Sequence, residues 1–141
     1  MHVEGDVFRR FVVSGREEMT PGPSAQALEQ LRLRYRLAAA AADAYFDAGF
    51  TVAWDDVVST ELLPECVALL RSRPVHVVVL APRADVVAAR DAARLATGYA
   101  AWSVEALRAA FVGASAPGLW LDTSEQTPDE TVDAIIAALG D

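Results

Sequence analysis

The sequence predicts an α/β fold in which helices cover both faces of a parallel sheet, the doubly wound arrangement. Short apolar runs alternate along the chain with longer amphipathic segments, the order expected for strands and helices joined by right-handed crossovers. The clearest strand is the apolar run over 75–80 between two prolines, a pattern typical of a parallel strand covered on both faces. With 141 residues, of which 53% are of apolar types, the chain is expected to form a single domain over 1–141.

The first half of the chain predicts two strands and one long helix. Ser24 is a suitable N-cap for that helix, because apolar residues recur after it at spacings of three and four. Gly49 is a suitable residue to end it. The expected elements are a strand ending near Asp6, a loop over 14–24, a helix over 25–48 and a strand over 50–54.

The second half continues the alternation. Thr127 and Glu130 form a capping-box pattern, and Pro128 stands at the first position of the helix that they begin. Ser103 is a suitable N-cap for an earlier helix. His76, inside an apolar run, is expected to be a core histidine. The expected elements are helices over 61–71, 83–95 and 103–111, strands over 75–80 and 118–122, and a final helix after Thr127.

Charge and composition exclude several classes of function. A formal net charge of −8 disfavours general nucleic-acid binding. All twelve basic residues are arginines, so this chain supplies no lysine for Schiff-base chemistry, for general base catalysis or for phosphate binding. No apolar run approaches the length of a membrane span. Cys66 is the only cysteine, which excludes an intrachain disulfide and makes a reducing cytoplasm the expected location.

Carboxylates follow the predicted strands, where ligands of open parallel sheets bind. Asp6, Asp56 and Asp122 each stand at such a position, and Asp55 is expected to belong to a turn. A carboxylate there can accept a proton from a substrate hydroxyl or hold a magnesium ion. The alternative is that these aspartates cap the following helix or turn.

Two pairs of arginines are candidate anion ligands. Arg90 and Arg94 are four residues apart and share one face of a predicted helix, where guanidinium groups could close over a polyphosphate. The alternative for this pair is ion pairing on the helix surface. Arg9 and Arg10 follow Asp6 and would place two cations beside that acid, although exposed loop arginines are common.

Several segments together resemble the small P-loop kinases, most closely the chloramphenicol-phosphotransferase-like and gluconate-kinase-like ATP-binding phosphotransferases. The likeness covers nearly the whole chain and rests on the order and spacing of its segments. These segments are His2 to Phe11, Leu31-Arg32-Leu33-Arg34-Tyr35-Arg36-Leu37-Ala38, Asp56-Val57-Val58, Leu80-Ala81-Pro82-Arg83, and Arg90-Asp91-Ala92-Ala93-Arg94 through Tyr99.

The resemblance implies γ-phosphoryl transfer from Mg-ATP to a small hydroxylated acceptor. Asp6 would be the catalytic acid near the acceptor hydroxyl, with Arg9 and Arg10 as substrate-side cations. Asp56 would be a catalytic residue and magnesium ligand on the strand that resembles Walker B. Arg90 and Arg94 would bind the triphosphate from a lid over about 90–101.

The sequence departs from that family at its start. It contains no G-x-x-x-x-G-K-[ST] segment, so the family's first strand, phosphate-binding loop and first helix are missing from these residues. The missing strand is central in the family's sheet, and its loss would leave two half-sheets with exposed inner edges. We therefore expect an N-terminally truncated P-loop kinase-like domain with little or no ATP turnover.

Two alternatives to an incomplete kinase remain open. One is a non-catalytic kinase remnant that acts as a ligand-binding or protein-interaction module. The other is an unrelated doubly wound domain. The sequence does not define the acceptor or the oligomeric state.

Overall fold

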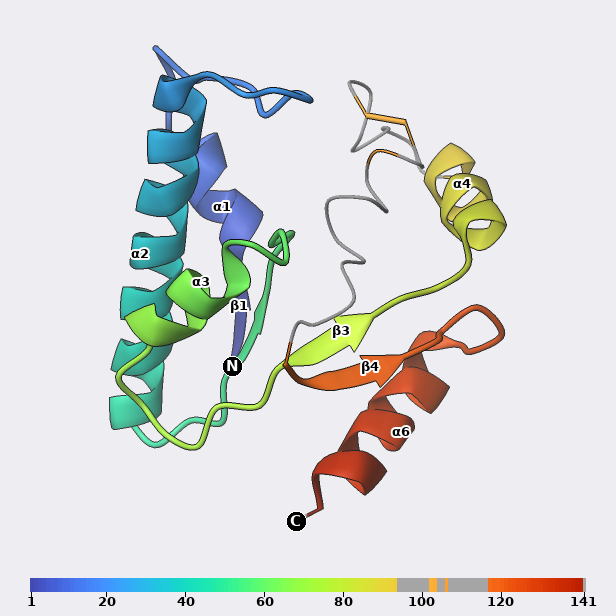
Figure 1. Cartoon of the computed structure of the whole chain (residues 1–141). Coiled ribbons are helices and arrows are strands. Elements are labelled where there is room, and N and C mark those ends of the chain that lie inside the picture. The colour runs from blue at the N-terminus through green and yellow to red at the C-terminus, as the bar shows by residue number, and fades with distance from the viewer. Residues whose placement is uncertain (94–101, 104–105, 107–116, 141) are drawn as a thin grey trace. The chain divides into compact units, whose positions relative to one another are not determined.

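The computed structural model describes residues 1–93, 102–103, 106 and 117–140, and the chain divides into two compact units. The first unit is Met1–Val75 and the second is His76–Asp141. Figure 1 shows the elements of each unit.

The first unit contains a two-stranded parallel sheet and three helices. β1 (His2–Glu4) pairs with β2 (Ala53–Asp55), with Val3 opposite Trp54. The long helix α2 (Ala25–Asp47) packs against α1 (Gly5–Arg10) and against α3 (Leu63–Leu69), as Figure 1 shows. The core lies where the sheet and these helices meet. Its buried apolar residues are Val3, Ala27, Leu31, Tyr35, Ala38, Ala39, Ala42 and Cys66.

The start and the buried face of α2 confirm the sequence prediction. The Ser24 hydroxyl accepts a hydrogen bond from the Ala27 amide at 3.0 Å, which satisfies one of the free N–H groups of the first turn. Leu31, Tyr35 and Ala38 follow at spacings of four and three and are all buried. The alanines at the C-terminal half of this face leave room for close packing.

A buried carboxylate joins α2 to the chain that leaves α3. Asp43 accepts hydrogen bonds from the Ser72 amide at 2.9 Å, from the Ser72 hydroxyl at 2.6 Å and from the Arg71 amide at 3.1 Å. Burial raises the pKa of Asp43, but these hydrogen bonds outweigh burial and leave the pKa below its ordinary value. Asp43 therefore has a structural role.

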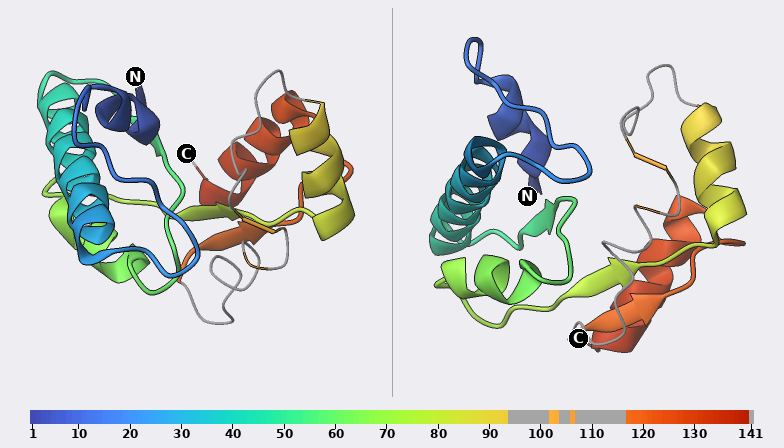
Figure 2. Two further views of the ribbon diagram at one scale, coloured as in Figure 1. Left: turned by 90° about the horizontal axis from the view of Figure 1, so that it is seen from above. Right: turned by 45° about the horizontal axis from the view of Figure 1, so that its top comes forward.

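The second unit also has a two-stranded parallel sheet. β3 (Val78–Leu80) pairs with β4 (Leu119–Leu121), with Val79 opposite Trp120. The helices of this unit are α4 (Ala84–Ala92) and α6 (Pro128–Leu139), and the views of Figure 2 show α6 running beside the strand pair. The capping box at Thr127 and Glu130 is formed as the sequence predicts.

The strands are shorter and less covered than expected. Within the described residues each sheet has two strands, in the orders β1-β2 and β3-β4, so one doubly wound sheet remains a prediction. The expectation that the 75–80 strand is covered on both faces is wrong, because Leu80 is 54% exposed. His76 is exposed too, so it is not a core histidine. β3 pairs only with β4 among the described residues, so it lacks the second neighbouring strand that its apolar sequence implied.

One predicted boundary changes, and Asp55, which was expected to belong to a turn, is instead the last residue of β2. The first strand ends at Glu4, and Asp6 lies in the first turn of α1, because Gly5 already begins the helix. The helix expected over 103–111 and the lid expected over 90–101 lie mostly outside the described residues. At the start of that helix, the Ser103 hydroxyl accepts from the Ala106 amide at 3.1 Å. In the described part of the chain, no helix has the length and apolar character to cross a membrane.

Replacing Thr127 with alanine tests the capping box of α6. The Thr127 hydroxyl accepts from the Glu130 amide at 3.3 Å, and the Glu130 carboxylate accepts from the Thr127 amide at 2.8 Å. We expect Thr127→Ala to lower the free energy of unfolding by about 1 kcal/mol, measured by urea denaturation followed by circular dichroism. Asp133→Ala, an exposed change within the same helix, is the control and should change stability by less. Equal losses in both variants would contradict the capping role.

Candidate functional site

The candidate site lies just beyond the C-terminal ends of β1 and β2. Glu4 and Asp55 are register partners at the ends of these parallel strands, so the residues after them leave the sheet at the same edge. Asp6 follows β1 in the first turn of α1, and Asp56 follows β2 directly. The structure therefore brings together the two carboxylates that the sequence singled out in this unit.

Arg34 of α2 bridges the two carboxylates. Its Nη1 donates a hydrogen bond to Asp6 Oδ1 at 3.0 Å, and its Nη2 donates to Asp56 Oδ1. The side chain of Asp56 is 4% exposed and that of Arg34 is 10% exposed, whereas that of Asp6 is 53% exposed. The cluster is thus a buried ion pair with one accessible carboxylate at its outer end.

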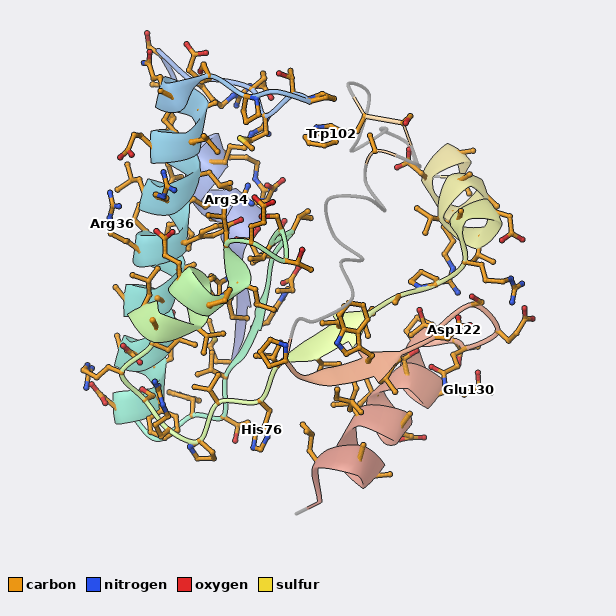
Figure 3. All side chains as sticks on the ribbon, in the orientation of Figure 1. Arg34, Arg36, His76, Trp102, Asp122 and Glu130 are labelled. Atoms are coloured by element: carbon orange, nitrogen blue, oxygen red, sulfur yellow. The ribbon has the colours of Figure 1, made fainter. Side chains whose placement is uncertain are left out.

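The helical register explains why an arginine is buried here. Arg34 lies three residues after Leu31 and four before Ala38, and both of these residues belong to the buried face. Figure 3 shows Arg34 and the exposed Arg36 on different sides of α2. Sequence reasoning did not assign Arg34 a role. The sequence feature that could have indicated this role is a charged residue at a position where the helical spacing calls for an apolar one.

Neighbouring groups hold the pair in place. The Arg34 guanidinium lies 5.6 Å from the centre of the Tyr35 ring, within cation–π range. The Tyr35 hydroxyl donates to the Val57 carbonyl at 3.0 Å, and the Val57 amide donates to Asp56 Oδ1 at 2.7 Å. α2 therefore contacts Asp56 directly through Arg34 and fixes the following residue through Tyr35.

Gly5 lies directly against the Asp56 carboxyl group. A Cβ atom built on Gly5 would lie 1.8 Å from Asp56 Oδ2 and 2.4 Å from its Cγ. No side chain fits in that space, so glycine is required at the turn from β1 into α1. The close approach also covers Oδ2, which has no hydrogen-bond partner among the described residues.

Burial dominates the electrostatics of the site. It raises the pKa of Asp56 to about 6, while Arg34 and the Val57 amide oppose the shift. Asp6 adds a smaller repulsion, and the Trp54 indole a smaller lowering. Burial also raises the pKa of the Cys66 thiol to about 12 and moves the pKa of Tyr35 upward. At neutral pH the site therefore holds an ionised Asp56 paired with Arg34, beside an uncharged thiol and phenol.

Magnesium does not fit at Asp56. Mg²⁺ requires near-octahedral oxygen ligands at about 2.0–2.1 Å and keeps several waters. Asp56 Oδ1 already accepts from Arg34 and from the Val57 amide, and Oδ2 is covered by Gly5. The described residues also include no group of three or more histidine, cysteine, aspartate or glutamate side chains arranged to hold a metal.

The predicted substrate-side arginines are engaged in ion pairs on α1. Arg9 pairs with Glu18 of the following loop, and Arg10 donates to both Glu4 carboxylate oxygens at 3.2 and 3.3 Å. They are helical residues, in contrast to the loop positions expected for them. Both arginines follow Asp6 in the chain, but each guanidinium group is bonded to a protein carboxylate.

The predicted triphosphate ligands lie in the second unit. Arg90 Nη2 donates to the Thr123 carbonyl at 2.8 Å and to the Gln126 carbonyl at 3.3 Å, so it closes the loop between β4 and α6. Arg94 lies outside the described residues. Asp122 accepts from the Ser124 amide at 2.9 Å and therefore caps the turn, as the alternative interpretation proposed.

A mainly apolar groove adjoins the site between α1, the 14–24 loop and α2. Its apolar lining includes Phe8, Met19, Leu31 and Leu37. Arg34 also belongs to the lining, so the groove reaches the buried ion pair. The groove has a volume of only about 60 Å³, so a small apolar group of a ligand could enter it beside Arg34, but a whole ligand could not.

Comparison with known proteins gives no further assignment: no family model, curated protein or solved structure matches the chain. The site is therefore interpreted from its own residues.

Replacing Gly5 with alanine tests the close approach to Asp56. The added methyl group would overlap the carboxyl group, and such overpacking typically costs about 1–3 kcal/mol. We expect Gly5→Ala to lower the free energy of unfolding by that amount, measured by urea denaturation. In an Asp56→Ala background the same change should cost clearly less, because the overlapping carboxyl group has been removed. An unchanged cost in both backgrounds would show that the contact does not constrain Gly5.

The raised pKa of Asp56 predicts a pH dependence of stability. An aspartate in the unfolded chain has a pKa near 4, whereas folded Asp56 releases its proton near pH 6. Between these values the folded state holds a proton that the unfolded chain has released. The contribution of Asp56 to stability is therefore largest below about pH 4 and falls as the pH rises to about 6. Urea denaturation from pH 4 to 7 should show this fall in the wild type relative to Asp56→Asn, and parallel profiles would contradict it.

Proposed function

We propose that this chain carries the acceptor-binding part of a small-molecule kinase-like phosphotransferase. The observation that supports it best is the accessible Asp6 carboxylate, held by a buried Arg34–Asp56 pair at the C-terminal edge of two parallel strands. Such an edge is where open parallel sheets bind ligands, and a carboxylate there suits a substrate hydroxyl. The small adjoining groove would take an apolar group of the acceptor.

In this proposal Asp6 acts as the general base. Its Oδ1 accepts from Arg34, which fixes the carboxylate and leaves Oδ2 to accept the proton of an acceptor hydroxyl. The apolar lining around Phe8 and Leu37 would exclude water from the body of the acceptor. ATP would supply the transferred γ-phosphoryl group.

The described residues do not form a triphosphate site. The sequence has no phosphate-binding loop and no lysine, and Arg90 is bonded to backbone carbonyls of its own unit. We expect the 141-residue chain alone to turn over little or no ATP, and phosphorylation of any acceptor by this chain with Mg-ATP would contradict this expectation.

The second candidate function is a non-catalytic ligand-binding or protein-interaction module. The bonding of Arg90 to its own loop supports it, because that guanidinium needs no phosphate partner. The two candidates differ in what they require of the protein in its source. Weighing the intact protein and sequencing its N-terminus discriminates between them: a joined G-x-x-x-x-G-K-[ST] segment favours the phosphotransferase, and a start at Met1 favours the module.

Acceptor binding can be tested without phosphoryl transfer. The ¹⁵N-labelled chain would be titrated with a panel of small alcohols that have apolar bodies, and amide shifts would be recorded by NMR. We expect shifts at Phe8, Leu31 and Leu37, and binding at least about tenfold weaker in Asp6→Asn, because a hydrogen bond to a charged group is lost. Asp133→Asn, an exposed change in the second unit, is the control. Binding that is equal in both variants would remove Asp6 from the acceptor site.

A further inference from the structure

We infer that Arg34 is the built-in cation of this site and the residue that positions Asp6. It is bonded to Asp56, the residue to which the kinase resemblance assigns a magnesium ion. The use of Asp6 as a base rests on the proposed function. The charge arrangement itself rests on the geometry alone.

The shape of the Arg34 guanidinium suits its two carboxylate partners. A guanidinium is planar and delocalised, and each of the two Nη atoms of Arg34 serves a different carboxylate. Two carboxylates and one guanidinium leave the cluster with a formal charge of −1, most of it at the exposed Asp6. A point cation such as an ammonium group could not bridge the carboxylates in the same way.

The groups that surround Arg34 also suit an arginine side chain. The Arg34 side chain is nine-tenths buried and enters the site from the packed face of α2. The Tyr35 ring lies within cation–π range of it. Gly5 and the Val57 amide also contact the Asp56 carboxyl group. A hydrated metal ion would have to displace Arg34 to reach that carboxylate.

This arrangement has a measurable consequence for metal binding. With Arg34 present, Mg²⁺ has no accessible carboxylate pair to bridge. Without the guanidinium, Asp6 and Asp56 face one another across a site that lacks a cation, and an uncompensated buried carboxylate is strongly destabilising. A divalent ion would then relieve the repulsion and partly restore the fold.

The experiment uses the whole 141-residue chain as wild type, Arg34→Gln and Arg34→Lys. Arg36→Gln is the matched control, because Arg36 is an exposed arginine of the same helix. Thermal unfolding would be followed with and without millimolar Mg²⁺, and the aspartate side-chain carboxyl signals by ¹³C NMR. Arg34→Lys keeps the positive charge and removes the double bridge.

We expect Mg²⁺ to leave the unfolding temperature of the wild type unchanged. It should also leave that of Arg36→Gln unchanged. Arg34→Gln should unfold about 10 °C or more below the wild type and recover part of that loss in Mg²⁺. If Arg34→Gln is unfolded without metal, refolding on addition of Mg²⁺ is the expected result. In Arg34→Lys the Asp6 carboxyl signal should move, and in Arg36→Gln it should not.

Three outcomes would overturn the inference. The first is a saturable shift of the Asp56 carboxyl signal by Mg²⁺ in the wild type. The second is an Asp6 signal that does not move in Arg34→Lys. The third is an Arg34→Gln variant whose unfolding does not respond to Mg²⁺. If these expectations are met but no acceptor binds, the result counts against the proposed function and leaves the role of Arg34 intact.

Discussion

The buried ion pair between Arg34 and Asp56 constrains the whole first unit. Removing both charges from water is costly, so the pair is tolerated only where further hydrogen bonds and close packing surround it. The Val57 amide, the Tyr35 ring and Gly5 supply these surroundings from three segments of the chain. A buried salt bridge is weak evidence of stability, but it narrowly restricts the arrangements in which these segments can meet.

Local patterns were sufficient to predict α2, α6 and the two carboxylates of the site, but not α1, which begins at Gly5 where a strand was expected to continue. Ser24 and Thr127 cap their helices through bonds that span three residues, and such bonds are visible in a short stretch of sequence. Arg34 could not be assigned in this way, because its partners lie 28 and 22 residues away. An arginine on an amphipathic helix is ordinarily a surface residue, and only tertiary structure shows which face it joins.

The errors at 75–80 and at Arg90 have a common origin. Apolar periodicity reports what a strand would bury if neighbours were available, and Leu80 stays exposed because its strand has one neighbour among the described residues. Arg90 has the positive charge and the planar, forked guanidinium group of a phosphate ligand. Backbone carbonyls of the loop after β4 accept hydrogen bonds from the same guanidinium, and sequence spacing does not report that competition.

The two units therefore differ in how far they suit phosphoryl transfer. In the first unit Arg34 is bonded to both carboxylates, so Asp56 is not free to bind a metal and Asp6 is held in a fixed orientation. Fixed charges of this kind need no reorganisation when a substrate hydroxyl loses its proton. In the second unit Arg90 is already satisfied by its own backbone and offers no comparable preorganised charge to a phosphate. Under the proposed function, Asp6 would therefore serve the acceptor, and Arg90 would not serve the phosphate.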